Sequence, residues 1–305
     1  MTISASAVKE LRERTGAGML DCKNVLIETD GDIEKAIDVL REKGLAKAAK
    51  KSGRIAAEGL VRVVISGSGD KAGIIEVNIE TDFASKNEEF IGIVDSLAAQ
   101  TLTTGATDAE GFIQEKYNGT NDTVQETLTN FIAKIGENVS VRRIEVFNES
   151  GVVYVGYLHL GGKIGVVVGL KTDAAAPEVE TLGKDVAMQV ASMNPQFVDE
   201  SCVDPDYIEK EKEILVKQAL SEGKPPEIVE KMVMGRLKKE LKETCLLEQK
   251  FVKNSELTVA QYVSDSAKAL GKDVNVVSMA RFEVGEGIEK KEENFADEVA
   301  KQIKH

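Results

Sequence analysis

The chain has no tryptophan, two histidines, three cysteines and only 5% aromatic residues in a length of 305. With so few aromatic side chains, its cores must be built from Val, Ile, Leu and Ala. Cys22, Cys202 and Cys245 are too far apart in sequence for a zinc-binding pattern. Their odd number indicates free thiols in a reducing compartment, so neither a disulfide framework nor a cysteine-ligated metal site is expected.

Enzyme signatures are also missing. There is no Gly-rich phosphate loop ending in Lys-Ser/Thr, no G-x-G-x-x-G after a strand and no G-x-S-x-G elbow. The Gly-Glu-Gly stretch at 285–287 lacks the third glycine and the following helix of a nucleotide loop. A catalytic triad needs a histidine near a nucleophile, and His159 has none close in sequence. Chemistry alone favours a structural histidine at a strand edge, and we expect no catalytic residue, no metal site and no cofactor.

Positive charge is in short supply. The net charge is -13 and the pI about 4.9, which disfavours nucleic acid as a partner because its phosphates would repel an acidic surface. The same charge favours solubility and rapid encounter with a basic patch on another protein. No apolar run reaches membrane-spanning length, and the N-terminal residues lack a basic or Arg-rich presequence. We therefore expect a cytoplasmic protein that binds neither nucleic acid nor membrane.

The first fifty residues predict three short helices. The first ends at a Thr-Gly-Ala-Gly break at 15–18, the second spans 19–28, and the third begins after Asp32 and is expected to end at Gly44. Their apolar spacing predicts a small bundle of the ubiquitin-associated type. A stretch with five positive residues and no acid lies at 43–54, and we expect an exposed, partly helical linker there. A solvated face is favoured over a contact patch for an acidic partner.

From residue 60 the apolar period changes to two, which indicates strands. The order strand, strand, helix, helix, strand is predicted and then repeated, so we interpret the core as an internal duplication. The polar residues 103–121 are left unassigned. The first copy comprises strands 60–66, 72–80 and 139–147, with helices 88–102 and 124–135; the second comprises strands 152–158, 163–172 and 274–284, with helices 177–192 and 259–270.

The two copies differ in spacing, because matching residues near the start lie 91 apart and those near the end 135 apart. The additional residues must form an insertion between 192 and 258. Charged helical patterns at 204–222 and 225–243, separated by Gly-Lys-Pro-Pro, predict an antiparallel helical hairpin there. Ile208, Leu215 and Ala219 are expected to face Ile228, Met232 and Gly235.

The fold class is therefore α+β: an N-terminal three-helix bundle, a duplicated core, an inserted hairpin and a C-terminal amphipathic helix. The expected domains are a bundle with linker at 1–54, core subdomain N at 55–150, core subdomain C at 151–202 with 251–285, the hairpin at 203–250 and the C-terminal module at 286–305.

Glu80 and Asp82 share one face of an extended segment, which is compatible with acid–base work or a metal. The alternative is structural: a strand end followed by Asp82 or Asn87 capping the helix that starts at Glu88. The residues by themselves favour capping.

Two stretches carry a resemblance. Residues 11–26, LRERTGAGMLDCKNVL, and 76–86, EVNIETDFASK, resemble the two signatures of the elongation factor Ts family. Further similar stretches lie at 134–138, 223–225 and 281–290. Three departures are visible: Ala84 where Val is typical, Ile79 where a small residue is common, and Lys253 where Met is familiar. The third removes an apolar contact that the family would otherwise imply.

The resemblance implies a guanine-nucleotide exchange factor that binds elongation factor Tu and promotes release of its GDP, rather than an enzyme. The implied exchange residues are those of one turn, with Phe83 as a wedge and Asp82 disturbing the groups that hold magnesium. They are Thr81, Asp82, Phe83 and Ala84. The implied partner-binding residues are Leu11, Arg12, Met19, Leu20, Lys23, Ile135, Gly136, His159, Val252 and Lys253. Because the hairpin serves self-association in some family members, a homodimer through it is one expectation.

Two other hypotheses are open on the residues alone. A general adaptor would bind the GTPase without changing its nucleotide off-rate. A metal protein or enzyme using Glu80 and Asp82 would bind a metal ion tightly by itself. The aromatic Phe83 beside Asp82 argues against both, since neither function needs it.

Overall fold

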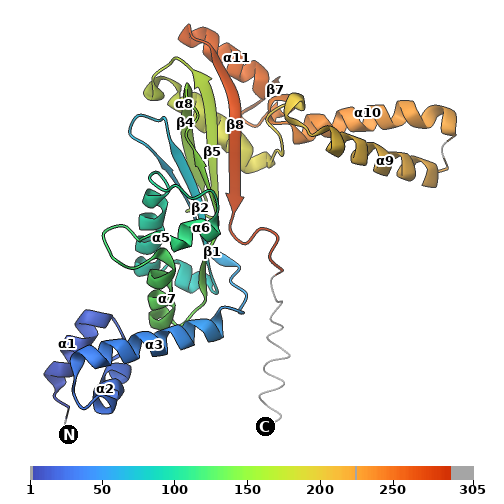
Figure 1. Ribbon diagram of the computed structural model, residues 1–305. Helices are drawn as coiled ribbons and strands as arrows, with labels where there is room; N and C mark the ends of the chain where they lie inside the picture. Colours follow the sequence, from blue (N-terminus) through green and yellow to red (C-terminus); the bar gives the residue numbers. More distant parts are fainter. Residues whose placement is uncertain (1–2, 224, 290–305) are drawn as a thin grey trace. The chain divides into compact units, whose positions relative to one another are not determined.

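The computed structural model describes residues 3–223 and 225–289 (Figure 1). The described residues mix helices with three small sheets, which confirms the α+β class. It divides into two compact units, the first made of 1–61, 75–144 and 283–305 and the second of 62–74 and 145–282. Among the described residues, no helix combines the length and apolar character needed to cross a membrane.

Three helices at the N-terminus pack against one another around a small apolar core. Leu11, Cys22 and Leu26 are fully buried in that core. The helices are α1 (Ala5–Thr15), α2 (Met19–Glu28) and α3 (Ile33–Lys51). The prediction that the third helix ends at Gly44 was wrong. Gly44 is buried where α3 crosses α7, with Ala133 so near that an added Cβ would lie 3.3 Å from its Cβ, so this glycine serves close packing.

The first three-stranded sheet has the order β1-β2-β3. Four helices separate its second and third strands in sequence, and Phe90 of α5 stacks on Phe131 of α7 with ring centroids 6.3 Å apart. The strands are β1 (Glu58–Ile65), β2 (Ala72–Ile79) and β3 (Val139–Phe147), and the helices are α4 (Asp82–Ser85), α5 (Glu88–Gln100), α6 (Ala109–Gln114) and α7 (Val124–Ile135).

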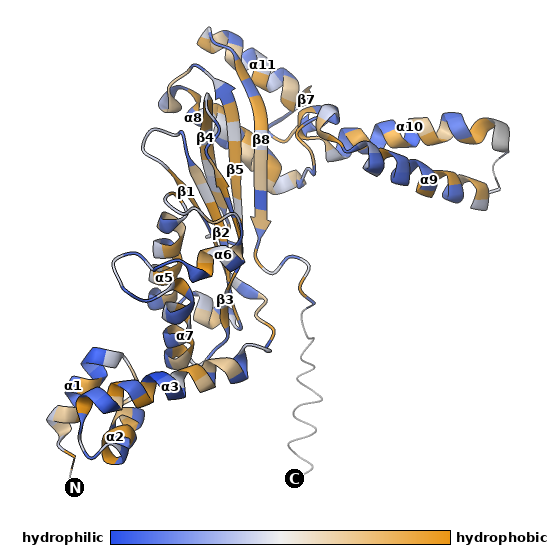
Figure 2. Cartoon of the chain, viewed as in Figure 1, coloured by the Kyte–Doolittle hydropathy of each residue, from blue (hydrophilic) through white to orange (hydrophobic). Residues whose placement is uncertain are grey.

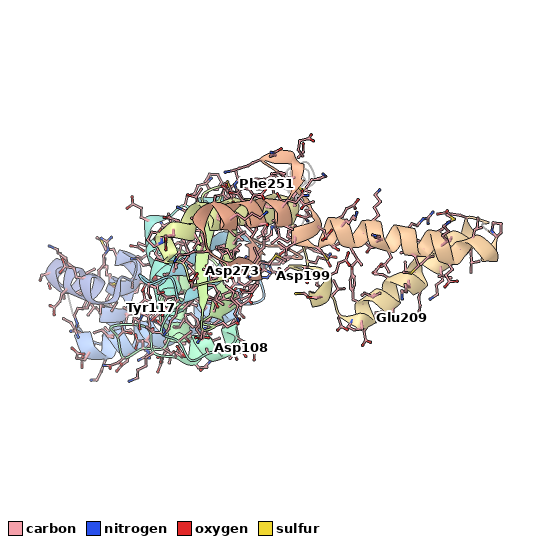
Figure 3. The ribbon with its side chains drawn as sticks, turned by 90° about the horizontal axis from the view of Figure 1, so that it is seen from above. Asp108, Tyr117, Asp199, Glu209, Phe251 and Asp273 are labelled. Atoms are coloured by element: carbon pink, nitrogen blue, oxygen red, sulfur yellow. The ribbon has the colours of Figure 1, made fainter. Side chains whose placement is uncertain are left out.

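The unassigned segment 103–121 contains α6, a short helix that periodicity did not reveal. Asp108 caps it by accepting a hydrogen bond from Gly111 N at 2.7 Å, and Phe112 is its buried residue. Asp108 and Tyr117, which both lie in this segment, are labelled in Figure 3. A helix of only six residues offers too few turns for an apolar period to appear in the sequence.

The second sheet has the order β4-β5-β8, and β4 pairs antiparallel with β5 from Val152 opposite Lys171 to His159 opposite Ile164. Helix α8 packs on both of these strands. Two short 3-10 turns lie at 200–202 and 246–248. The remaining elements are β4 (Val152–His159), β5 (Ile164–Thr172), α8 (Ala176–Met193), β6 (Lys250–Phe251), β7 (Asn254–Thr258), α11 (Val259–Leu270) and β8 (Val274–Glu283).

Helices α9 (Pro205–Ser221) and α10 (Pro226–Thr244) lie side by side as a hairpin (Figure 1). Hydrophobic and hydrophilic residues alternate in bands along both helices (Figure 2). Leu215 and Ala219 of α9 are buried as predicted, but the α10 face was wrong. Its buried residues are Val229, Val233, Leu237 and Leu241, which recur every four residues. Ile228 and Gly235 are exposed, so the predicted stripe was one or two positions away from the buried one.

The helix predicted at 288–305 in the C-terminal module falls almost wholly on residues 290–305, which lie outside the described residues. Just before that module, the chain turns after β8 at Gly285 (φ 72°). A Cβ there would lie 2.2 Å from the carbonyl oxygen of Ala57, so only glycine permits this close backbone approach.

Candidate partner-binding site

The turn that follows β2 carries an exposed aromatic ring. Thr81 caps α4 by accepting a hydrogen bond from Ala84 N at 3.2 Å, and this cap starts the helix immediately after the strand. Phe83 is 82% exposed, more than any other large apolar side chain among the described residues. Ala84 is buried beneath it. Since burying a Phe side chain is worth ~1.5–3 kcal/mol, the ring is a strong candidate for contact with another molecule.

Asp82 lies beside that ring and has a cationic neighbour in its own chain. Lys86 Nζ is 2.9 Å from Asp82 Oδ2 and 5.9 Å from the centroid of the Phe83 ring. Both Lys86 and Asp82 are largely solvent-accessible, so the pair is weak and can rearrange when a partner arrives. The sequence analysis did not identify Lys86, although its i+4 spacing from Asp82 on a helical turn was a usable signal.

Glu80 does not pair with Asp82. Its Oε1 accepts a hydrogen bond from Asn138 N at 2.6 Å, and its Oε2 lies 3.4 Å from Arg54 Nη1. This carboxylate therefore already has partners that hold the backbone. Asn87 caps α5, accepting from Glu89 N at 2.9 Å, as the capping interpretation predicted. Within the described ranges, no group of three or more acidic, His or Cys residues is arranged to hold a metal ion.

The N-terminal bundle presents a second apolar surface. Met19 is 61% and Leu20 70% exposed in the first turn of α2, and Arg12 and Lys23 are exposed near them in sequence. Leu11 is different, because it is fully buried in the bundle core. Its side chain offers no surface to a partner, and its role here is to support the helices that present the others.

Ile135 and Gly136 end α7. Gly136 adopts the left-handed conformation (φ 83°), which lets its N–H return to the carbonyl of Ile132 at 2.9 Å and close the helix. Its own carbonyl accepts a hydrogen bond from Lys51 Nζ. Ile135 is half-buried, so it can contribute both to the core and to a contact.

The second unit carries the other three candidate residues. His159 ends β4, with its Nδ1 3.0 Å from Tyr157 Oη, and is half-buried. Val252 and Lys253 form the exposed turn between β6 and β7. Lys253 Nζ lies 2.5 Å from Asp185 Oδ1, so the cation found where Met is familiar has an anionic partner in its own unit.

That same Asp185 accepts a hydrogen bond from Tyr262 Oη at 2.6 Å, and the Tyr262 ring stacks on Phe251 at 4.2 Å between centroids. Burial, and then the hydrogen bond to Asp185, raises the pKa of Tyr262 to about 12. Phe251 can be located in Figure 3. The β6–β7 turn is thus fixed from below by an aromatic stack and an anion.

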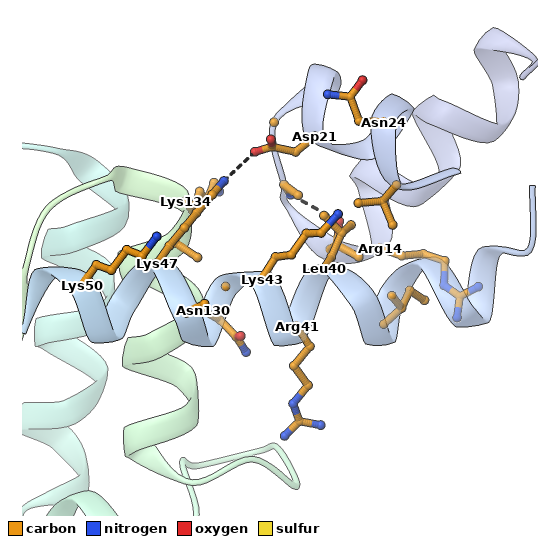
Figure 4. A pocket seen from close by; sticks show the side chains of 18 of the residues that line it. Arg14, Asp21, Asn24, Leu40, Arg41, Lys43, Lys47, Lys50, Asn130 and Lys134 are labelled. Atoms are coloured by element: carbon orange, nitrogen blue, oxygen red, sulfur yellow. Dashed lines mark hydrogen bonds and ion pairs between the residues drawn. The ribbon is translucent and has the colours of Figure 1, made fainter. Parts of the chain in front are cut away.

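A cleft of about 560 Å³ in the first unit is lined by many of the basic residues of α3 (Figure 4). The acids of this chain balance several of them. Lys47 Nζ is 3.0 Å from Asp21 Oδ2, and Lys43 pairs with Glu28. Lys134 of α7 also lines the cleft, and its Nζ is 2.6 Å from Glu89 Oε1. The basic stretch at 43–54, predicted as a partly helical linker, is helical up to Lys51, and its cations are partly neutralised in place.

Exposed apolar side chains held on rigid turns and helix ends are typical of proteins that act by binding another protein. The comparisons with known proteins agree with this class. The family model described as Elongation factor TS matches residues 80–286. Elongation factor Ts of Clostridioides difficile (strain 630) is 56% identical over 302 residues, covering 99% of each chain. That of Clostridium botulinum (strain Alaska E43 / Type E3) is 55% identical over 301 residues, again 99% of each. That of Clostridium perfringens (strain 13 / Type A) is 54% identical over 300 residues, 98% of each.

The chain belongs to the elongation factor Ts family, and it is a factor of translation elongation in protein biosynthesis. This confirms the resemblance carried by residues 11–26 and 76–86.

Proposed function

We propose that this chain is a guanine-nucleotide exchange factor for elongation factor Tu, acting in the cytoplasm by protein–protein binding alone. The observation that carries the proposal is the 82% exposure of Phe83 on a capped turn beside Asp82. An apolar ring exposed to this extent contributes little to packing in its own domain, which supports a role in contact with a partner.

The ring acts as a wedge. Packed interfaces have discrete arrangements and resist gradual deformation, so an inserted aromatic drives a neighbouring helix pair into its other arrangement. Asp82 is adjacent to Phe83, and its carboxylate competes for the groups around the magnesium ion of the partner. A bound GDP is held by that ion and by backbone donors around its phosphates, so loosening either lowers nucleotide affinity steeply.

No covalent bond is made or broken in this process. The coupling is reciprocal. If binding of this chain lowers the affinity of the GTPase for nucleotide, bound nucleotide lowers the affinity of the GTPase for this chain in the same ratio. GTP then displaces this chain from the GTPase. The remaining contacts come from Met19, Leu20, Arg12 and Lys23 of the bundle, from the end of α7, and from the turns that carry His159 and Val252.

The proposal also covers the architecture. We infer that the core is duplicated and that the bundle is of the ubiquitin-associated type. The duplication is supported by matching helix ends: Thr123 and Thr258 each form a capping box, and Gly136 and Gly271 each close their helix in the left-handed conformation. The offset of both pairs is 135 residues, and the hairpin lies in the interval that this offset assigns to an insertion.

The test is release of labelled GDP from elongation factor Tu, followed by stopped-flow fluorescence with and without this chain. Truncating a buried interface aromatic typically costs about 2 kcal/mol or more. Phe83→Ala should therefore slow stimulated release about 30-fold, the rate factor that corresponds to such a loss. Its fold should be retained, because the ring contributes little burial to the free chain.

Leu270→Ala is the matched control, since it also truncates an exposed apolar side chain but lies at the end of α11, away from every proposed contact. Its exchange activity should equal that of the parent. Unchanged release with Phe83→Ala would refute the wedge. Binding without any acceleration of release would favour the adaptor hypothesis instead.

A further inference from the structure

The exposed turn stands on two carboxylates that the exchange reaction does not use directly. Glu80 precedes the turn, and Glu137 lies in the loop between α7 and β3. Glu137 Oε2 accepts a hydrogen bond from Thr81 N at 3.0 Å, and its Oε1 accepts one from Thr81 Oγ1 at 2.8 Å. In return, Glu80 Oε1 accepts from Asn138 N at 2.6 Å. In each segment, a carboxylate therefore accepts a hydrogen bond from a backbone N–H of the other segment.

We call these reciprocal bonds between 80–81 and 137–138 the clasp. The clasp is connected to the tip of the turn, residues 81–83, through Thr81. The Thr81 hydroxyl donates to Glu137 and accepts from Ala84 N at 3.2 Å. The N-cap of α4 is therefore oriented by a carboxylate that lies 56 positions further along the chain. Bonds between an ionised carboxylate and N–H or O–H donors are roughly twice as strong as neutral ones, which suits a short, exposed element.

The end of α3 is fastened to the same place. Asn138 Nδ2 donates to the carbonyl of Arg54 at 2.8 Å, and Arg54 Nη1 lies 3.4 Å from Glu80 Oε2. Lys51 Nζ donates to the carbonyl of Gly136. The last cations of the basic stretch at 43–54 therefore join the bundle's third helix to the loop that holds the turn.

The physical need for such a clasp follows from the size of α4. A helix of four residues cannot be stable by itself, because forming the first turn costs free energy that only the hydrogen bonds of further turns would offset. Fixing the backbone of one residue costs about 1–2 kcal/mol, so a turn without anchors would sample many orientations. A wedge that must enter a packed interface works only if it is already oriented, since ordering it on contact would reduce the gain.

We propose that Glu137 is a positioning residue for exchange: it orients the Thr81–Phe83 tip through the clasp without contacting the partner. The inference rests on the proposed function for its kinetic consequence. Its structural consequence, an ordered tip in the free protein, can be measured without any partner.

The absence of tryptophan from the chain gives a clean reporter. In a Phe83→Trp background, Trp fluorescence anisotropy reports the mobility of the tip alone. Glu137→Ala should lower this anisotropy, while the far-UV circular dichroism spectrum of the chain stays the same. Glu137→Gln retains an acceptor for Thr81 N and a polar group for the hydroxyl, so it should restore most of the anisotropy.

Glu115→Ala is the matched control. Glu115 Oε1 accepts from Thr104 Oγ1 at 2.7 Å and from Gly105 N at 3.1 Å, the same two kinds of bond in another loop of the same unit. It should leave the tip anisotropy unchanged.

In the chain that retains Phe83, Glu137→Ala should reduce the maximal rate of stimulated GDP release about tenfold, as expected for a misplaced reacting element. The concentration of factor that gives half of this rate should change little, because the contacts made by Met19 and Leu20 are intact. A merely structural role would lower the melting temperature and leave the maximal rate of the folded protein unaltered.

Unchanged anisotropy in Glu137→Ala would overturn the clasp. An unchanged maximal rate of GDP release with Glu137→Ala would also overturn it, provided that Phe83→Ala is inactive in the same assay. If Phe83→Ala itself retained full activity, the wedge would fall and anisotropy alone would decide on the clasp. If Glu137→Ala did not fold, Glu137→Leu of similar volume would replace it. Loss of folding in both would also overturn the inference, which confines the effect of Glu137 to the tip.

Discussion

A buried carboxylate in the first unit allows a quantitative test of what holds its sheet together. Glu76 lies in the middle of β2 and is fully buried. Its Oε1 accepts from Gly285 N at 2.8 Å and from Asn78 Nδ2 at 3.1 Å. Arg142 Nη1 lies 3.1 Å from Oε1 and Arg143 Nε 2.6 Å from Oε2. One side chain thus joins β2, β3 and the turn that follows β8.

Glu76→Ala removes the acceptor for all of these donors at once. Breaking a buried pair by deleting one partner costs about 3–5 kcal/mol when the remaining charge stays buried. Here Arg142 and Arg143 are 27% and 30% exposed and can regain some water, so the lower end of that range applies. We expect a loss of about 3 kcal/mol in the free energy of unfolding of the first unit.

The assay is urea unfolding followed by circular dichroism, with hydrogen exchange and mass spectrometry assigning the change to peptides of β2, β3 and 283–289. Those peptides should exchange much faster in the variant, while peptides of β4 and β5 should not. Glu42→Ala, an exposed carboxylate on α3, is the control and should shift stability by less than ~0.5 kcal/mol. A loss below ~1 kcal/mol for Glu76→Ala would refute the reasoning that this network anchors the turn after β8.

Two further outcomes concern the hairpin. We propose that the chain self-associates through the exposed apolar residues of the hairpin. Sedimentation velocity should then show a mass that rises with protein concentration, and replacing Ile228 and Met234 by Asp should abolish the rise. A parent chain that is monomeric at every concentration would contradict the proposal. Burial raises the pKa of Cys245 from 9.0 to about 11. The folded state therefore retains the thiol proton longer than the unfolded state, and this contribution to stability is complete below pH 9 and lost as the pH rises toward about 11. Thermal melts across that window should show the loss, and Cys245→Ala should remove it; at neutral pH, only exposed Cys202 should react rapidly with a thiol reagent.

Much of the fold could be predicted because long amphipathic elements announce themselves in sequence. The strand predicted at 139–147 is β3, and the capped helix predicted from residue 88 is α5. The failures have a common cause in tertiary packing. Gly44 looked like a helix end, but its missing side chain makes room for α7. The buried face of α10 was misjudged because α10 carries apolar residues on two adjacent stripes, and only the contact with α9 selects one of them.

The candidate site was predictable to a different extent. Motif resemblance identified the tip of the turn, yet it could not distinguish side chains that present themselves from side chains that support. Leu11 belongs to the signature and is buried, whereas Met19 and Leu20 in the same stretch are exposed. Only the accessible area of each side chain separates them.

The base of the turn could not be predicted at all, and the reason is geometric. Glu80 read locally as half of an acid pair with Asp82, because the two alternate along an extended segment. In the structure, Glu80 accepts a hydrogen bond from Asn138 N, and Thr81 N donates one to Glu137. These bonds join positions that are far apart in sequence. Both oxygens of Glu80 are engaged within the chain, Oε1 by Asn138 N and Oε2 by Arg54, so this carboxylate has a structural role in the free protein. The contacts that hold the base of this turn therefore engage Glu80, and they argue against an acid pair between Glu80 and Asp82, whose carboxylate pairs with Lys86 instead.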